Sequence, residues 1–248
     1  MPMFSHLKRT AKRALRGAVR VAVESMHSQM RFPTYPASVR DNLRDIEDNT
    51  RYATLALALA RLELDGMGGA IAELGVYKGF TAKFIHQQLP DRTLYLFDTF
   101  KGFPREALEG VHDQRFQDTS IQEVKRCIGD LRNIEFRVGY FPDSAKGLED
   151  EKFALVMLDF DLYRSAMDAL DFFYPRLNPG GYFFLHDFNN PESNFAISRA
   201  ANEFLRDKPE FLLEIPDEWG TAVFRKTKIG FDENAGLELT GNSMRASI

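Results

Sequence analysis

Acidic and imidazole side chains follow two apolar runs of the sequence, at the point where each run ends. Asp159 comes directly after Phe153–Leu158, and His186 and Asp187 come directly after Tyr182–Leu185. If the two runs are neighbouring parallel strands, their carboxyl ends lie ~4.8 Å apart and the three side chains converge. Two carboxylates and an imidazole in one cluster can bind a divalent cation, and an imidazole beside carboxylates can also act as a general base. We therefore take this cluster as the candidate catalytic centre.

The members of the cluster differ in how strongly the sequence indicates a function. Asp159 has the strongest claim, because a carboxylate that ends an apolar strand is costly unless it is paired or used. His186 could instead pack under the sheet, but its place between a strand end and an acid favours a functional role. Asp161 has two equal interpretations, since it can join the cluster or cap a helix that begins near Tyr163.

A second chemical signal is a loop with two glycines in AIAELGVYKGFTAKFI, residues 70–85. The loop reads E-x-G-x-x-x-G, with Glu73, Gly75 and Gly79, and lacks the third glycine of the dinucleotide fingerprint. An acid at the strand end suits an amino group better than it suits a pyrophosphate. Asp98 ends the next apolar run, 23 residues after Gly75, where an acid binds ribose hydroxyls in this type of fold. A cofactor with a ribose, an ammonium and no phosphates meets these requirements, so we predict S-adenosylmethionine.

Strand-like and helix-like segments alternate along the chain around these residues. Apolar runs that predict strands are Ala70–Leu74, Thr93–Phe97, Ile134–Val138, Phe153–Leu158, Tyr182–Leu185, Phe211–Ile215 and Thr221–Phe224. Helical spacing predicts helices at Val39–Leu64, Thr81–Gln88, Ile121–Gly129, Ser165–Phe173 and Phe195–Leu205. The alternation indicates an α/β fold with a Rossmann-like, doubly wound parallel sheet. Only the turn PDEWG separates the last two runs, so they should form a C-terminal antiparallel hairpin at one side of the sheet.

N-terminal helices precede the predicted sheet. In the long helix Val39–Leu64, the spacing assigns the buried side to Leu43, Ile46, Thr50, Ala53, Leu57 and Ala60. Residues 4–24 combine a mostly alanine apolar face with basic residues on the other faces. This helix is a candidate for contact with an anionic membrane surface, and the favoured alternative is a solvated arm or a helix packed on the domain. We divide the chain into a basic amphipathic extension at 1–30, a cofactor-binding domain at 31–228 and a flexible tail at 229–248.

Composition narrows the class of partner and the compartment. The formal charge of the 248 residues is −4, but residues 1–31 hold seven bases and one acid, which leaves 25 bases against 35 acids in the remainder. Such an acidic body is a poor ligand for nucleic acid. The single cysteine, Cys127, excludes an intrachain disulfide framework, and no apolar run approaches the ~18 residues that span a bilayer. We expect a soluble cytoplasmic protein, with membrane association and a homo-oligomer left open.

Several of these segments together resemble a known family. AELGVYKGFTAKFI, LYLFDTFKGFP, FQDTSIQEVK, VMLDFDLYRSAMDALDFFYPRLNPGGYFFLHDFNNP and PDEWGTAVFRK are similar to the macrocin O-methyltransferase group of class I S-adenosylmethionine-dependent methyltransferases, over about residues 40–227. The resemblance implies a seven-stranded methyltransferase sheet at 31–228 and methylation of a sugar hydroxyl, assisted by magnesium. It does not identify the substrate, because related members of unknown substrate share the pattern.

Motifs and resemblance together define the predicted sites. The predicted cofactor-binding residues are Glu73, Gly75, Tyr77, Gly79, Asp98, Thr99, Gly139, Tyr140 and Asp159; the predicted metal ligands are Asp159, His186 and Asp187. Macrocin-type enzymes place a candidate base histidine where this chain has His112, although a surface-loop histidine is the favoured interpretation there. They also carry two consecutive acids where this chain has HDF. Since imidazole replaces a hard oxygen ligand, the site should favour manganese, iron or zinc over magnesium.

Other side chains near the predicted strand ends have two interpretations each. Arg105, Arg115 and Arg164 could contact an anionic substrate, with solvated surface charge as the default. The aromatic residues Phe100, Phe103, Tyr140 and Phe141 could flank adenine or pack in the core. Trp219 lies in the turn of the predicted hairpin, and the sequence does not show whether its side chain packs in the core or lines the site.

The sequence therefore predicts a metal-assisted O-methyltransferase that acts on a sugar, a glycosylated small molecule or a glycolipid. One alternative is a metal-independent methyltransferase in which His186 is the base. Another is an NAD-dependent oxidoreductase on the same fold, which the position of Glu73 and the missing third glycine disfavour. A third alternative is a membrane-surface binding protein without catalysis. It is disfavoured because such a protein has no need of Glu73, Asp98 or Asp159.

Overall fold

The computed structural model describes residues 49–103, 115–217 and 220–227 of the chain. The predicted helix at 4–24, the predicted tail at 229–248 and the side chains of His112 and Trp219 lie outside these ranges. No helix within the described ranges is both long enough and apolar enough to cross a membrane.

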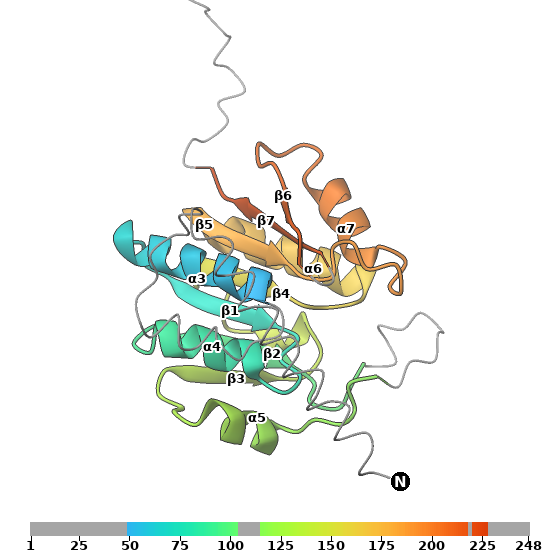
Figure 1. The fold of residues 1–248 in the computed structure, drawn as a ribbon. Coiled ribbons are helices and arrows are strands. Elements are labelled where there is room, and N and C mark those ends of the chain that lie inside the picture. The colour runs from blue at the N-terminus through green and yellow to red at the C-terminus, as the bar shows by residue number, and fades with distance from the viewer. Residues whose placement is uncertain (1–48, 104–114, 218–219, 228–248) are drawn as a thin grey trace, which may run out of the picture. The chain divides into compact units, whose positions relative to one another are not determined.

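The described strands form one seven-stranded sheet (Figure 1). In chain order they are β1 (Ala70–Leu74), β2 (Leu94–Asp98), β3 (Ile134–Val138), β4 (Phe153–Leu158), β5 (Leu177–Leu185), β6 (Leu213–Ile215) and β7 (Thr221–Arg225). Their order in the sheet is β3-β2-β1-β4-β5-β7-β6, with β1 to β5 parallel. Strand β7 is antiparallel to both β5 and β6. The predicted doubly wound sheet and its terminal hairpin are confirmed.

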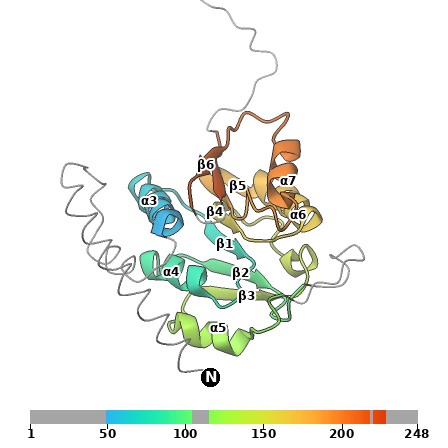
Figure 2. The ribbon, with the colours of Figure 1, turned by 45° about the vertical axis from the view of Figure 1, so that its right-hand side comes forward.

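Helices cover both faces of the sheet. The described helices are α3 (Asn49–Leu64), α4 (Phe80–Gln88), α5 (Ile121–Ile128), α6 (Tyr163–Phe173) and α7 (Ala196–Phe204), with short 3-10 turns at Asp143–Ala145 and Tyr174–Arg176. Figures 1 and 2 show α3, α4 and α5 on one face and α6 and α7 on the other. This division follows from chain handedness, because right-handed crossovers that run outward from β1 and from β4 in opposite directions place their helices on opposite faces.

The end of the fifth predicted strand was correct but its start was not. Strand β5 begins at Leu177, so the segment NPGG, which resembles a loop, lies within the strand. A Cβ at Gly181 would come within 2.7 Å of the Ala154 carbonyl oxygen. Glycine is therefore needed there because β4 and β5 approach closely, and in this case it does not mark a turn.

The predicted buried side of α3 is wrong. The buried residues of this helix are Tyr52, Leu55, Ala56, Ala58, Leu59 and Leu62. Of the predicted set, Thr50 and Leu57 are exposed and Ala53 and Ala60 are only half-buried, while Leu43 and Ile46 lie outside the described ranges. The cause is the run LALALA, which places apolar residues around most of the helix and leaves no single stripe to identify the buried face.

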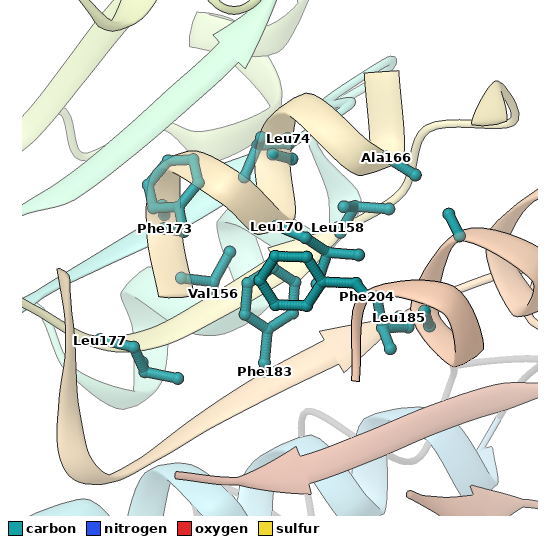
Figure 3. Packing of buried hydrophobic residues seen from close by; sticks show 14 of the residues in the cluster. Leu74, Val156, Leu158, Ala166, Leu170, Phe173, Leu177, Phe183, Leu185 and Phe204 are labelled. Atoms are coloured by element: carbon teal, nitrogen blue, oxygen red, sulfur yellow. The ribbon is translucent and has the colours of Figure 1, made fainter. Parts of the chain in front are cut away.

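The core between the sheet and α6 holds the strands in place. Figure 3 shows Ala166, Leu170 and Phe173 of α6 over side chains of β4 and β5. Phe173 is fully buried, and its ring centroid lies 4.9 Å from that of Phe153 and 5.7 Å from that of Phe97. Because aromatic packing of this density leaves little freedom, the strand ends beyond it have defined positions.

Backbone hydrogen bonds continue past the end of each strand and position the residues that follow. The N–H groups of Gly75, Asp159 and His186 donate to the carbonyls of Phe97, Leu74 and Leu158 at 2.9, 2.8 and 2.8 Å. Gly75 has φ +86°, and a Cβ there would lie 2.2 Å from the Asp159 carbonyl oxygen. Only glycine therefore allows the loop after β1 to approach the end of β4 this closely.

We predict that Gly75→Ala is more destabilising than Gly66→Ala. Gly66 also has a positive φ, +59°, but a Cβ there meets nothing within 4 Å, so the control measures backbone strain alone. The left-handed backbone should lower the free energy of unfolding of Gly66→Ala by about 1–2 kcal/mol. In Gly75→Ala, the overlap with Asp159 should lower it by about 1–3 kcal/mol more. The measurement is the free energy of urea unfolding of both variants, and equal losses would show that the close approach is not a constraint.

Candidate functional site

A cavity of about 790 Å³ opens where the carboxyl ends of the parallel strands meet. The predicted site residues that line it are Gly75, Tyr77, Asp98, Thr99, Gly139, Tyr140, Asp159, His186 and Asp187. These residues follow or end β1 to β5, and β1 and β4 flank the point where the strand order reverses. Ligands of doubly wound sheets bind at this switch point, so the fold itself supports the predicted site.

The predicted cluster of Asp159, His186 and Asp187 is present in the folded chain. His186 Nδ1 lies 2.9 Å from Asp159 Oδ1 and 3.2 Å from Asp187 Oδ2. One ligand atom from each residue lies within 4.8 Å of the other two. The imidazole therefore stands between two carboxylates that come from the ends of adjacent parallel strands.

Charge in this cluster is strongly coupled. Burial alone would lower the pKa of His186, but the charge of Asp159 and hydrogen bonds to Asp159 and Asp187 raise it to about 10. Burial alone would raise the pKa of Asp159, but the charge and the hydrogen bond of His186 bring it below its usual value. Without a metal, the cluster is thus an imidazolium that bridges carboxylates, and both charges stabilise each other.

The donor set of the cluster fits a divalent metal ion. Cis ligands around such an ion lie about 3 Å apart, close to the separations of His186 Nδ1 from the two carboxylates. An ion bound there would take the place of the Nδ1 proton. The hydrogen bonds that would support these ligands are less complete. His186 Nε2 is buried and has no hydrogen-bond partner among the described residues. Metal-binding histidines usually donate that second N–H to an outer acceptor.

Asp161 belongs to the cavity and does not cap a helix. The N-cap of α6 is Leu162, and no side chain caps this end, so the capping interpretation is wrong. Asp161 is 8% exposed and lines the cavity, and Arg115 Nη1 lies 3.6 Å from its Oδ2. Burial, followed by the charges of Asp187 and Asp159, raises its pKa to about 7. Asp161 can therefore offer a protonated carboxyl or a carboxylate to a ligand near neutral pH.

Asp98 has a structural role that the sequence did not predict. Its Oδ2 accepts hydrogen bonds from the N–H groups of Val76 and Tyr77 at 2.8 and 2.9 Å, and its Oδ1 accepts one from Phe100 N–H at 2.7 Å. The carboxylate thus stabilises the glycine loop after β1. Since a carboxylate has about four acceptor positions, one remains for a ribose hydroxyl.

The other predicted members of the glycine loop do not line the cavity. Glu73 is 2% exposed, and no described residue bonds its Oε2. Burial and then the charge of Asp159 raise its pKa well above the usual range. Gly79 is the N-cap of α4 with φ +78°, and a Cβ there would lie 2.8 Å from Val124 Cγ1. Gly79 therefore serves helix packing, whereas Glu73 is a buried acid whose Oε2 has no donor among the described residues.

The structure also adds residues that the sequence did not indicate. Arg51 and Tyr52, in the first turns of α3, line the cavity beside Asp159. Only the chain topology could have indicated these two residues. A helix that precedes β1 and packs antiparallel to it brings its N-terminal end to the carboxyl edge of the sheet. Of the four aromatic residues that could flank adenine or pack in the core, Phe103, Tyr140 and the buried Phe141 line the cavity, whereas Phe100 is buried outside it.

Comparisons with known proteins agree with the predicted family and with the observed fold. The family model described as macrocin O-methyltransferase matches residues 45–210. Mycinamicin III 3''-O-methyltransferase of Micromonospora griseorubida is 29% identical over 153 residues, which span 54% of this chain and 60% of that enzyme. The 8-demethyl-8-(2,3-dimethoxy-alpha-L-rhamnosyl)-tetracenomycin-C 4'-O-methyltransferase of Streptomyces olivaceus is 28% identical over 50% of this chain and 54% of its own length. The structure of the O-methyltransferase NovP is similar in fold, with a TM-score of 0.63, 22% identity, and coverage of 79% of this chain and 90% of NovP.

We predict that the stability conferred by His186 depends on pH. Its pKa rises from 6.5 to about 10 on folding, so its contribution is complete below pH 6.5 and is lost as the pH rises through about 10. The pKa of Asp159 is lowered from 3.8, so its contribution is present above pH 3.8 and is lost as the pH falls below that value. The destabilisation by His186→Gln should therefore be largest between those limits, near pH 5 to 6, and should shrink towards pH 10.

Urea unfolding with a chelator present, at about pH 5.5, 8 and 10, measures this dependence. Asn202→Ala, an exposed change on α7, should show no such trend. A loss in His186→Gln that stays constant across the three pH values would contradict the pairing.

Proposed function

The chain belongs to the macrocin O-methyltransferase family, and from this premise we propose that it is an S-adenosylmethionine-dependent O-methyltransferase. Its proposed acceptor is a hydroxyl of a sugar, a glycosylated small molecule or a glycolipid. The observation that carries the proposal is one cavity in which the loop held by Asp98 faces the Asp159–His186–Asp187 cluster. The name of the Streptomyces olivaceus relative, which includes a rhamnosyl group, supports a glycosylated acceptor.

In the proposed reaction, the acceptor oxygen attacks the methyl carbon of the sulfonium. The C–O bond forms as the C–S bond breaks, which yields a methyl ether, S-adenosylhomocysteine and one proton. The methyl donor is already activated, so the protein must align the hydroxyl and accept its proton. Asp159, His186 and Asp187 lie together at the strand ends where they could do both.

A divalent metal held by Asp159, His186 and Asp187 would lower the pKa of the acceptor hydroxyl and orient it. Metal assistance is part of our proposal, and the donor set supports it. A metal-free His186 base is less favourable, because a pKa of about 10 keeps the imidazole protonated at neutral pH. His112 as base and membrane contact through residues 4–24 stay predictions, since neither lies in the described ranges.

We predict that Asp98→Ala weakens binding of S-adenosylhomocysteine at least about tenfold. The change removes a charged acceptor of a ribose hydroxyl and also releases the N–H groups of Val76 and Tyr77. Isothermal titration calorimetry measures the affinity, and the matched control is Asp150→Ala, an exposed acid in the turn before β4. Unchanged affinity would remove Asp98 from the cofactor site. Binding of NAD by the unmodified protein, without binding of S-adenosylhomocysteine, would favour the oxidoreductase instead.

We predict that the unmodified protein binds Mn²⁺ and that Asp159→Asn and His186→Gln each weaken this binding at least about tenfold, because each removes one ligand. Electron paramagnetic resonance of Mn²⁺ measures the bound fraction without need of an acceptor. With an accepted substrate, chelation should abolish turnover, and Mn²⁺ should restore it at least as well as Mg²⁺. Full turnover in the presence of chelator, with no bound Mn²⁺ in the resonance experiment, would instead support metal-independent transfer.

A further inference from the structure

We propose that Asn190 is a positioning residue, whose side-chain amide holds Asp187 against His186 and ties this pair to the loop that leads into α7. The inference rests on the function proposed above, because it concerns the groups that would bind a metal or accept the proton. It also assigns a role to residues 188–195, which connect the cluster at the end of β5 to α7 (Figure 1).

The side chain of Asp187 is aimed by a turn and not by its strand. The N–H of His186 still bonds to the Leu158 carbonyl of β4, whereas the Asp187 carbonyl accepts from the Asn190 N–H at 3.2 Å. Asp187 has a left-handed backbone, φ +55°, a conformation that is uncommon for residues other than glycine. The regular hydrogen bonds of the sheet therefore end before Asp187, and the turn must supply what orients its carboxylate.

Each oxygen of the Asp187 carboxylate has its own partner. Oδ2 lies 3.2 Å from His186 Nδ1, and Oδ1 accepts a hydrogen bond from Asn190 Nδ2 at 3.3 Å. Asn190 is only 4% exposed and Asp187 is buried, so water competes little for either group. Because both oxygens are held, the carboxylate cannot rotate freely, and Oδ2 stays directed at the imidazole.

The other atoms of Asn190 hold the loop. Its Oδ1 accepts from the Glu192 N–H at 2.9 Å, and its main-chain carbonyl accepts from Ser193 Oγ and Phe195 N–H, both at 3.1 Å. Phe195 is the N-cap of α7, and both Asn190 and Glu192 line the cavity. A side-chain amide can donate to an acid and accept from a backbone N–H at once, which an ionised carboxylate cannot do. Asparagine therefore joins one wall of the cavity to the cluster.

The proposed chemistry needs a fixed Asp187 carboxylate. Both uses of the cluster, as metal ligands and as an acid that holds the imidazole, depend on where its oxygens lie. Groups that hydrogen-bond to a metal ligand from outside commonly contribute about 10- to 100-fold to metal affinity. Asn190 acts in this way through Asp187, and its effect should appear in metal binding as well as in turnover.

The first test is the binding of Mn²⁺ to Asn190→Ala, measured by electron paramagnetic resonance. Affinity should fall about tenfold, because Asp187 loses the donor to Oδ1. Affinity for S-adenosylhomocysteine, measured by calorimetry, should stay within about twofold, since the loop held by Asp98 is a separate site. The matched control is Asn189→Ala, the same change at the neighbouring exposed residue, whose amide donates to Glu214 at 2.8 Å. The control should keep both affinities.

The second test observes the His186 ring by nuclear magnetic resonance of ¹⁵N-histidine-labelled protein with a chelator present. The Nδ1 resonance should move in Asn190→Ala and stay in Asn189→Ala. If Asn190 only stabilises the loop, its loss would lower the free energy of unfolding but leave both the Mn²⁺ affinity and this resonance unchanged. That result would overturn the inference, and so would equal effects of the two variants.

The unmodified protein gives a measurement that does not depend on the folding of a variant. The Asn190 side-chain N–H that bonds to Asp187 should exchange with solvent at least about tenfold more slowly than the side-chain N–H groups of Asn189. Equal exchange at the two positions would overturn the inference even if Asn190→Ala does not fold. The proposed function fails separately, if the unmodified protein does not bind S-adenosylhomocysteine. If it binds this ligand but no Mn²⁺, metal assistance fails, and the His186 resonance decides the role of Asn190.

Discussion

The hydrogen bond from the Asp159 N–H to the Leu74 carbonyl joins the ends of β4 and β1 at the point where the strand order reverses. The site depends on this junction. It places Asp159 beside the glycine loop, and the next bond, from His186 N–H to the Leu158 carbonyl, places the imidazole beside Asp159. The two strand ends can approach this closely only because residue 75 is glycine, since any side chain there would overlap the Asp159 carbonyl. The glycine loop after β1 and the Asp159–His186–Asp187 cluster thus lie on either side of one backbone contact.

The contact between β1 and β4 also brings several acidic side chains together, and neighbouring groups reduce the repulsion between them. Glu73, Asp159, Asp161 and Asp187 gather at neighbouring strand ends, where burial and mutual repulsion raise the pKa of Glu73 and of Asp161. The charge and hydrogen bond of His186 have the opposite effect on Asp159. A site with this many acids favours cationic ligands, and the proposed reaction supplies a sulfonium, an ammonium and a metal ion.

Local patterns were reliable where one physical signal dominated. Strand β1 was predicted with its observed bounds, because an apolar run stopped by Gly75 has one interpretation. Sequence patterns that two different structures can produce led to wrong or incomplete predictions. LALALA in α3 is apolar on most sides and did not identify the buried face. The strand predicted at Tyr182–Leu185 left out the preceding NPGG, although Gly181 serves the close packing of β4 and β5. Asp161 before a helix resembled a cap, but the chain reaches α6 through Leu162 and leaves the carboxyl in the cavity.

The sequence by itself determined the order of strands and helices along the chain, the family, and the identity of the acid that ends β2 and of the acid that follows β4. These properties are local or follow from the alternation of apolar runs, so they can be predicted from the sequence alone. Only the tertiary structure decided that His186 stands between two carboxylates, that Asp98 also holds the glycine loop, and that Arg51 reaches the cavity from α3. Apart from the adjacent pair His186 and Asp187, these contacts join residues that are 21 to 108 positions apart in the chain. Such contacts depend on strand register and helix packing, which no short stretch of sequence encodes.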